Sequence, residues 1–142
     1  NVFENIAYPL RLKGKKDFEI NERVNFLLKS FDISKKKKIS ARNLSAGNAQ
    51  FISFVRSVAN DPQILILDEV CSNLDDSNRK RVESYLKINK SKKKIIMITH
   101  DFLQAKRLAD EVIIIGKGRL LKKLDRQKFL KNEKKVINQY FS

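Results

Sequence analysis

Two adjacent carboxylates, Asp68 and Glu69, are the residues with the clearest chemical potential in the sequence. They directly follow Ile64 to Leu67, a short apolar run that is typical of a buried parallel strand. Catalytic groups in open α/β sheets lie at the carboxyl ends of strands. One carboxylate at such an end can offer oxygen to Mg²⁺, usually through water, and the other can polarise an attacking water. The alternative is a solvated strand end without a catalytic role.

A second strand end carries the only histidine of the chain, His100. It follows the apolar run at 94–99, which also reads as a buried strand. If the two strands are neighbours, the imidazole lies near Asp68 and Glu69, where it could donate a hydrogen bond to a phosphate oxygen. A purely structural histidine is the alternative.

The elements that must position these residues alternate between helices and strands, which favours an α/β fold with a largely parallel sheet. Apolar residues recur at helical spacing in one early segment: Phe18, Val24, Leu27, Leu28 and Phe31. We expect helices at 2–12, 17–31, 46–59, 76–89 and 101–109, strands at 64–69 and 94–99, a hairpin of 112–115 with 119–121, and a charged helical tail from Asp125.

Composition narrows the class of protein. The 142 residues include 31 Lys and Arg against 16 Asp and Glu, a formal charge of +15. Such a balance attracts phosphates, nucleic acid or anionic lipid, although a solvated lysine-rich surface is the simpler interpretation. Cys71 is the only cysteine, so no internal disulfide can form, and one Cys with one His makes a structural zinc site improbable. No apolar run is long enough to span a bilayer.

Several motifs, taken in order, resemble those of the ATP-binding cassette (ABC) ATPases, which have a P-loop hydrolase fold. The segment Leu44 to Asn48 resembles the signature Leu-Ser-Gly-Gly-Gln, and Gln50 and Arg56 match beyond it. The run Ile64 to Glu69 resembles the Walker B strand with its catalytic glutamate. Ser72 to Asp75 resembles the D-loop, and Thr99 to Asp101 resembles the switch-histidine region. The match covers about residues 1–121.

The resemblance implies a role for each matched residue. Glu69 would position water, His100 would contact the γ-phosphate of ATP, and Asp68 would help to hold Mg²⁺ through water. The signature residues would bind the ATP of a partner subunit at the start of a helix: Ser45, Ala46, Gly47 and Asn48. Asp75 would contact that subunit across the dimer.

The sequence also departs from the family pattern. Ala46 and Asn48 replace a glycine and a glutamine of the signature, Phe51 stands where arginine is common, and Val70 and Cys71 follow the glutamate in place of Pro and Thr. No Gly-x-x-x-x-Gly-Lys-Ser/Thr loop occurs in these 142 residues. We therefore expect the carboxy-terminal part of an ABC ATPase domain, without the Walker A segment. It would comprise a helical subdomain at about 1–60, the second half of the core at about 61–121 and a tail at about 122–142.

The favoured interpretation is the ATP-hydrolysing subunit of an ABC importer. It would be a peripheral protein on the cytoplasmic face of the membrane, and its solute could be a small oxyanion such as tungstate or molybdate. The expected partners are a second ATPase subunit in a homodimer, transmembrane permease subunits and a solute-binding protein, with ATP and Mg²⁺ as ligands. Nucleic acid is not an expected partner. The alternatives are a soluble ABC-type ATPase acting on nucleic acid or ribosomes, and an inactive truncated remnant.

Overall fold

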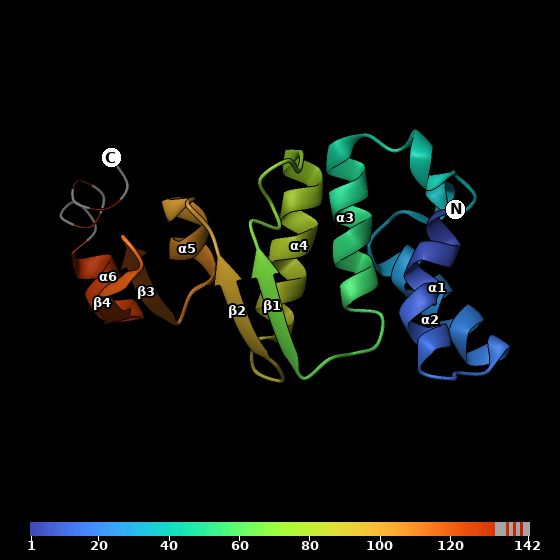
Figure 1. The fold of residues 1–142 in the computed structure, drawn as a ribbon, viewed down its shortest axis with the longest axis horizontal. Coiled ribbons are helices and arrows are strands. Elements are labelled where there is room, and N and C mark those ends of the chain that lie inside the picture. Colours follow the sequence, from blue (N-terminus) through green and yellow to red (C-terminus); the bar gives the residue numbers. More distant parts are fainter. Residues whose placement is uncertain (133–135, 137, 139, 141–142) are drawn as a thin grey trace. The chain divides into compact units, whose positions relative to one another are not determined.

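The elements follow one another in the order that the sequence predicts (Figure 1). The computed structural model describes residues 1–132, 136, 138 and 140. Its helices are α1 (Val2–Leu12), α2 (Asp17–Ser30), α3 (Ala46–Ser57), α4 (Asp76–Asn89), α5 (Phe102–Leu108) and α6 (Arg126–Lys131), and its strands are β1 (Ile64–Asp68), β2 (Lys94–Ile98), β3 (Glu111–Gly116) and β4 (Arg119–Asp125). Two short 3₁₀ turns, Ser34–Lys36 and Ala41–Asn43, connect α2 to α3. The predicted α/β class is confirmed.

The chain divides into two compact units, residues 1–97 and 98–142. The predicted subdomain boundaries near residues 60 and 121 stay predictions, and part of the predicted tail lies outside the described residues. Among the described residues, no helix has the length and apolar character needed to cross a membrane.

The core of the first unit joins α1, α2 and α3 through apolar side chains. An aromatic cluster lies at its centre: Phe31 makes edge contacts with Phe51 and Phe54, at centroid distances of 5.8 and 5.9 Å, and Tyr85 of α4 joins them. Phe51 is fully buried. The aromatic residue that replaces the usual arginine therefore anchors α3 in the core. Phe18 was expected on the buried face of α2 but is exposed, and Ile20 is buried there instead.

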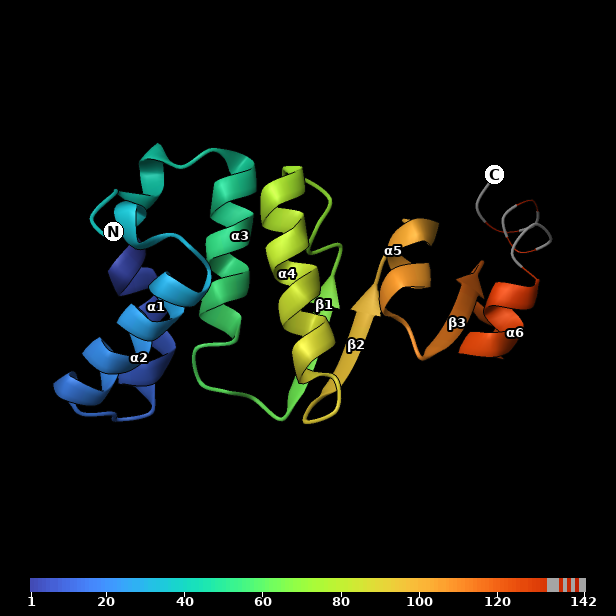
Figure 2. The same cartoon turned by 180° about the vertical axis from the view of Figure 1, so that it is seen from behind.

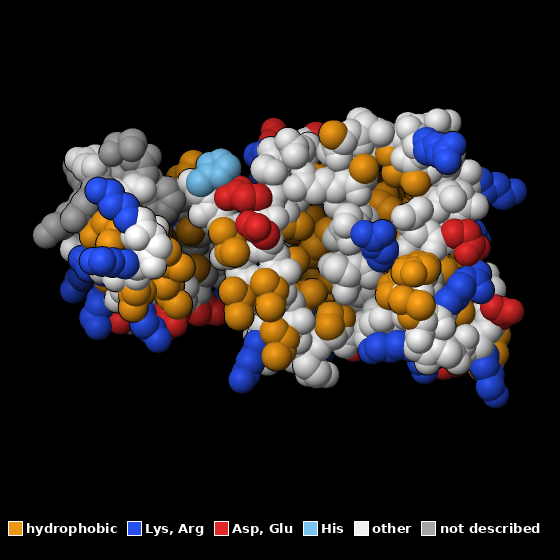
Figure 3. All heavy atoms as spheres, in the orientation of Figure 1, with side chains coloured by type: hydrophobic (Ala, Val, Ile, Leu, Met, Phe, Trp, Pro, Cys, Tyr) orange, Lys and Arg blue, Asp and Glu red, His pale blue; other side chains and the backbone are white. Residues whose placement is uncertain are grey.

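The strands β1 and β2 form a two-stranded sheet whose arrows run in the same direction in Figure 1. Figures 1 and 2 together show α4 on one face of this sheet. The prediction of fully buried strands is wrong for the other face, because Ile64, Ile66, Ile96 and Ile98 are between 53% and 70% exposed. Figure 3 shows hydrophobic side chains gathered over β1 and β2 on that face. Within the described part of the first unit, α4 covers one side of the sheet and these isoleucines lie exposed on the other side.

The second unit is a hairpin packed against two helices. The strands β3 and β4 pair antiparallel and extend beyond the predicted hairpin, with an irregularity between Ile114 and Ile115. Lys117 and Gly118 both have positive φ, as the two central residues of a type I′ turn require. The core of this unit brings together Phe102, Ile114, Leu124, Phe129 and Val136.

Candidate functional site

The two predicted carboxylates stand at the end of β1. Asp68 is the last residue of the strand and is exposed, and the half-buried Glu69 follows it. Glu69 has a φ of 46°, in the left-handed region that residues other than glycine seldom adopt. The chain thus turns sharply at Glu69 and leaves the sheet there.

The signature segment forms the start of α3, as predicted. Ser45 is the N-cap residue, and its hydroxyl oxygen accepts hydrogen bonds from the backbone N–H and the side-chain amide of Asn48, at 3.3 and 2.9 Å. Lys36 donates a hydrogen bond to the Asn48 side-chain oxygen, which brings a cation to this helix terminus. Ser45 and Ala46 are exposed, so this end of α3 is open to solvent.

Gly47 brings the signature helix into contact with the loop that follows Glu69. A Cβ atom at this position would collide with the carbonyl oxygen of Asn73 and would lie 3.9 Å from the Cα of Leu74. These are backbone atoms, which cannot rotate away. Glycine is therefore required at position 47 by close packing as well as by any approach of a phosphate.

Gln50 supplies a second link between α3 and the same loop. Its side-chain nitrogen donates a hydrogen bond of 2.9 Å to the carbonyl oxygen of Glu69, and its side-chain oxygen accepts one of 3.2 Å from the N–H of Asn73. In the sequence, Gln50 stands out only as a family match, and no local pattern predicts these contacts. Lys36 lies within a run of lysines, so no signal in the sequence distinguishes it from its neighbours.

Asp75, the predicted dimer contact, is the N-cap residue of α4. Its carboxylate accepts hydrogen bonds from the backbone N–H of Asn78 at 2.7 Å and from the Asn78 side chain at 3.2 Å. The residue is exposed, and its contact with a second subunit stays a prediction.

His100 belongs to the second unit, two residues beyond β2, and is exposed. The turn that carries it is held by the N–H of Asp101, which donates to the Thr99 hydroxyl, while Asp101 caps α5. The first unit therefore contains the signature residues together with Asp68, Glu69 and Asp75, whereas His100 lies in the second unit.

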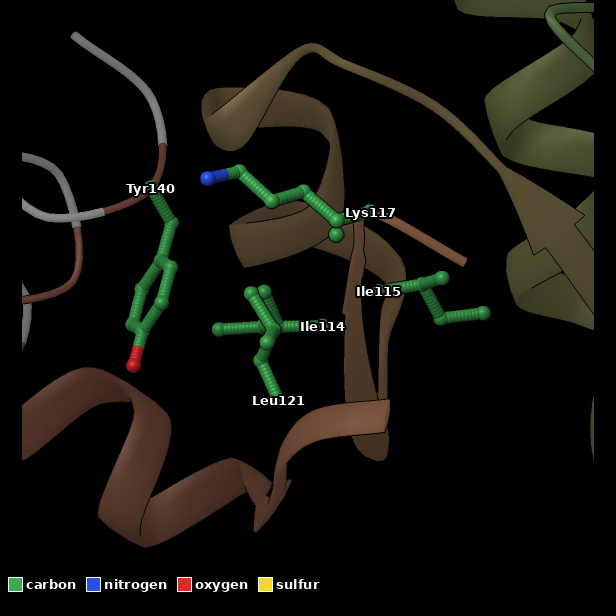
Figure 4. Close-up of a pocket in the computed structure, with 6 residues that line it drawn as sticks. Ile114, Ile115, Lys117, Leu121 and Tyr140 are labelled. Carbon is green, nitrogen blue, oxygen red and sulfur yellow. The ribbon is translucent and has the colours of Figure 1, made fainter. Parts of the chain in front are cut away.

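The described residues include no group of three or more His, Cys, Asp or Glu side chains arranged to hold a metal ion. A pocket of the second unit is lined by Ile114, Ile115, Gly116, Lys117, Leu121 and Tyr140. Figure 4 shows the Tyr140 ring facing Ile114 and Leu121, whereas Ile115 points away. None of the predicted site residues lines this pocket.

Comparison with known proteins defines the class of protein. The sequence pattern of the ABC transporter family matches residues 1–72, which hold the signature and the Walker B strand with its two acids. The chain belongs to the ABC transporter family.

Three curated relatives are named as import ATP-binding proteins. The "Methionine import ATP-binding protein MetN" of Haemophilus influenzae is 34% identical over 142 residues, covering 99% of this chain and 41% of the relative. The protein of the same name from Vibrio vulnificus is 39% identical over 124 residues, covering 86% of the chain and 36% of the relative. The "Phosphate import ATP-binding protein PstB 1" of Enterococcus faecalis is 36% identical over 148 residues, covering 100% of the chain and 59% of the relative. The chain thus spans less than two thirds of the length of these relatives.

Proposed function

We propose that the chain is part of the ATP-hydrolysing subunit of an ABC importer. One observation carries the proposal: the signature helix α3 is joined directly to the end of β1, so that Gly47 and Gln50 contact the loop that begins at Glu69. An anion-binding helix terminus and a pair of carboxylates thereby become one structural assembly. The import ATP-binding relatives support the same conclusion.

Asp68 and Glu69, at the end of β1, would have separate roles at the γ-phosphate. Glu69 would orient and polarise the attacking water, which is the task of a general base. Asp68 is an exposed carboxylate, and one hard oxygen fits a Mg²⁺ ion that keeps most of its water ligands. When bound, Mg²⁺ would supply charge neutralisation at the phosphates.

The signature residues would serve the nucleotide of a second, identical subunit. Ser45, Ala46, Gly47 and Asn48 form the first turn of α3, whose N–H groups and positive dipole end suit a phosphate. Lys36 adds a positive charge beside Asn48. His100 would donate a hydrogen bond to the γ-phosphate, and Asp75 would contact the second subunit.

The other partners would be permease subunits and a solute-binding protein, placing the subunit at the cytoplasmic face of the membrane. The predicted tungstate or molybdate specificity is not supported. The relatives are named for methionine and phosphate at similar identities of 34% and 36% to this chain. Similarity in this subunit therefore carries little information about the solute. The importer names also favour a transporter over an ATPase acting on nucleic acid or ribosomes.

A pair of conservative variants tests the proposal in the assembled transporter. Glu69→Gln should retain ATP binding and lower the hydrolysis rate by about 100-fold or more, because it removes the general base. Glu22→Gln makes the same change on the exposed surface of α2 and should hydrolyse ATP at the wild-type rate. Wild-type turnover by Glu69→Gln would refute the assignment.

The 142 residues alone should show no turnover, because they contain no glycine-rich loop to hold the phosphates. A magnesium-dependent ATPase rate in the purified chain would contradict this part of the proposal.

A further inference from the structure

The backbone of Glu69 is held in an uncommon conformation by contacts that converge on its carbonyl oxygen. Its φ of 46° places it in the left-handed region, which persists in non-glycine residues only where the surroundings enforce it. The carbonyl accepts from Gln50 Nε2 at 2.9 Å, from the Ser72 hydroxyl at 2.9 Å and from the Ser72 N–H at 3.1 Å. Three donors thus share the two lone pairs of this carbonyl oxygen.

The three donors differ in where they come from. Both Ser72 groups belong to the loop itself and move with it. Gln50 lies 19 residues earlier in the chain, on α3, and is the donor that ties the loop to a neighbouring helix. The next residue of that helix, Phe51, is fully buried in the aromatic cluster, so Gln50 projects from a firmly packed element.

The Gln50 amide fits the loop in one orientation. Its nitrogen faces the Glu69 carbonyl and its oxygen faces the Asn73 N–H, so a donor meets an acceptor at each end. A rotated amide would place two oxygens together at Glu69 and two N–H groups together at Asn73. The bond to the Glu69 carbonyl is partly buried, which limits the competition of water for it, whereas the bond from the Asn73 N–H is exposed.

We propose that Gln50 is a positioning residue for catalysis: its amide holds Glu69 in the left-handed backbone conformation that aims the Glu69 carboxylate. This inference rests on the proposed function, in which Glu69 positions the attacking water. Gln50 touches neither nucleotide nor water in this scheme. It acts only by fixing the backbone from which the catalytic side chain projects.

Two variants of Gln50 in the assembled ATPase test this inference. Gln50→Ala removes all three side-chain hydrogen bonds to the loop: those donated to the Glu69 carbonyl and to the Ser72 hydroxyl, and the one accepted from the Asn73 N–H. Gln50→Glu keeps the length of the side chain and can still accept from Asn73, but its ionised carboxylate repels the Glu69 carbonyl. Both should lower kcat by about 10- to 100-fold, the effect of displacing a catalytic group by a fraction of an ångström to 1 Å. The KM for ATP should change by less than about twofold, since ground-state binding does not use Gln50.

The pH profile separates positioning from a general structural role. In Gln50→Glu, protonation of the introduced carboxyl restores a donor toward the Glu69 carbonyl. The ratio of its kcat to that of the wild type should therefore rise as the pH falls. Gln63→Ala is the matched control, because Gln63 is exposed near the opposite end of β1 and should keep wild-type kinetics.

Each outcome bears on one of the two ideas. If Glu69→Gln is inactive while Gln50→Ala and Gln50→Glu have the wild-type kcat, the positioning role is wrong and the proposed function stands. If Glu69→Gln is active, the proposed function itself fails. Should Gln50→Ala not fold, Gln50→Glu decides alone: a lowered kcat that recovers toward acid pH supports the inference, and a wild-type kcat overturns it.

Discussion

Replacing Gly47 by alanine sets two known effects against each other. Alanine is the better helix former, and in a helix interior the change from glycine is worth about 1 kcal/mol, less in the first turn where Gly47 lies. Helix propensity alone therefore predicts a more stable protein. The structure predicts the opposite, because the added methyl group would meet the carbonyl group and backbone of Asn73 and Leu74.

The size of the opposing effect follows from the atoms involved. The added Cβ would overlap the Asn73 oxygen and would lie 3.4 Å from the Asn73 carbonyl carbon, so either α3 or the loop must move. Forcing extra volume into a packed site costs typically 1–3 kcal/mol. After subtracting the propensity gain, we expect Gly47→Ala to lower the free energy of unfolding by roughly 0.5–2 kcal/mol.

Urea unfolding followed by circular dichroism measures this difference. Ala46→Gly is the matched control, because it exchanges the same two residue types at an exposed position of the same turn. It should cost at most about 1 kcal/mol through propensity alone. A Gly47→Ala protein as stable as the wild type, or more stable, would refute the packing argument.

Three further predictions concern other parts of the first unit. The Lys93 ammonium, whose side chain is only 5% exposed, donates to Asp61 at 2.6 Å and holds the pKa of that carboxyl below its ordinary value. Asp61→Asn should therefore lower the unfolding free energy by roughly 0.5–1 kcal/mol near neutral pH. Urea titrations at decreasing pH should show this difference fading below about pH 4, as the wild-type carboxyl becomes protonated. Asp75→Ala should lower the free energy of unfolding by about 1 kcal/mol through loss of the α4 cap. Asp75→Asn keeps a capping side chain, so its melting temperature should be close to that of the wild type. Replacing Ile66 and Ile96 by threonine should reduce the fluorescence of a dye that binds apolar surface and leave the helical circular dichroism unchanged, because both side chains are exposed.

Local signals in the sequence predicted the elements closely. The predicted helices at 2–12 and 76–89 coincide with α1 and α4, and the structure shows Asn1 and Asp75 as their N-cap residues. The strand predicted at 64–69 likewise agrees with β1, which ends one residue earlier, at Asp68. What failed depends on neighbours in space. Phe18 has the right spacing for the core but faces solvent.

The same limit applies to the candidate site. A run of four apolar residues cannot show that α4 covers one face of β1 alone, which is why the expected burial of the strands was wrong. No local sequence pattern predicts the left-handed backbone of Glu69, because that conformation depends on contacts with Gln50 as well as with Ser72. The sequence motifs identify the residues of the candidate site. The contacts between these residues depend on packing, which the motifs do not encode.

At position 69, the residue that would best stabilise the fold differs from the residue that ATP hydrolysis would require. Glycine adopts a positive φ without steric penalty, so Glu69→Gly would relax the turn by up to about 1 kcal/mol while deleting the carboxylate. Selection for thermal robustness alone would then favour glycine, and selection for turnover would favour glutamate. A library at position 69, screened separately for the two properties, would rank these residues in opposite order.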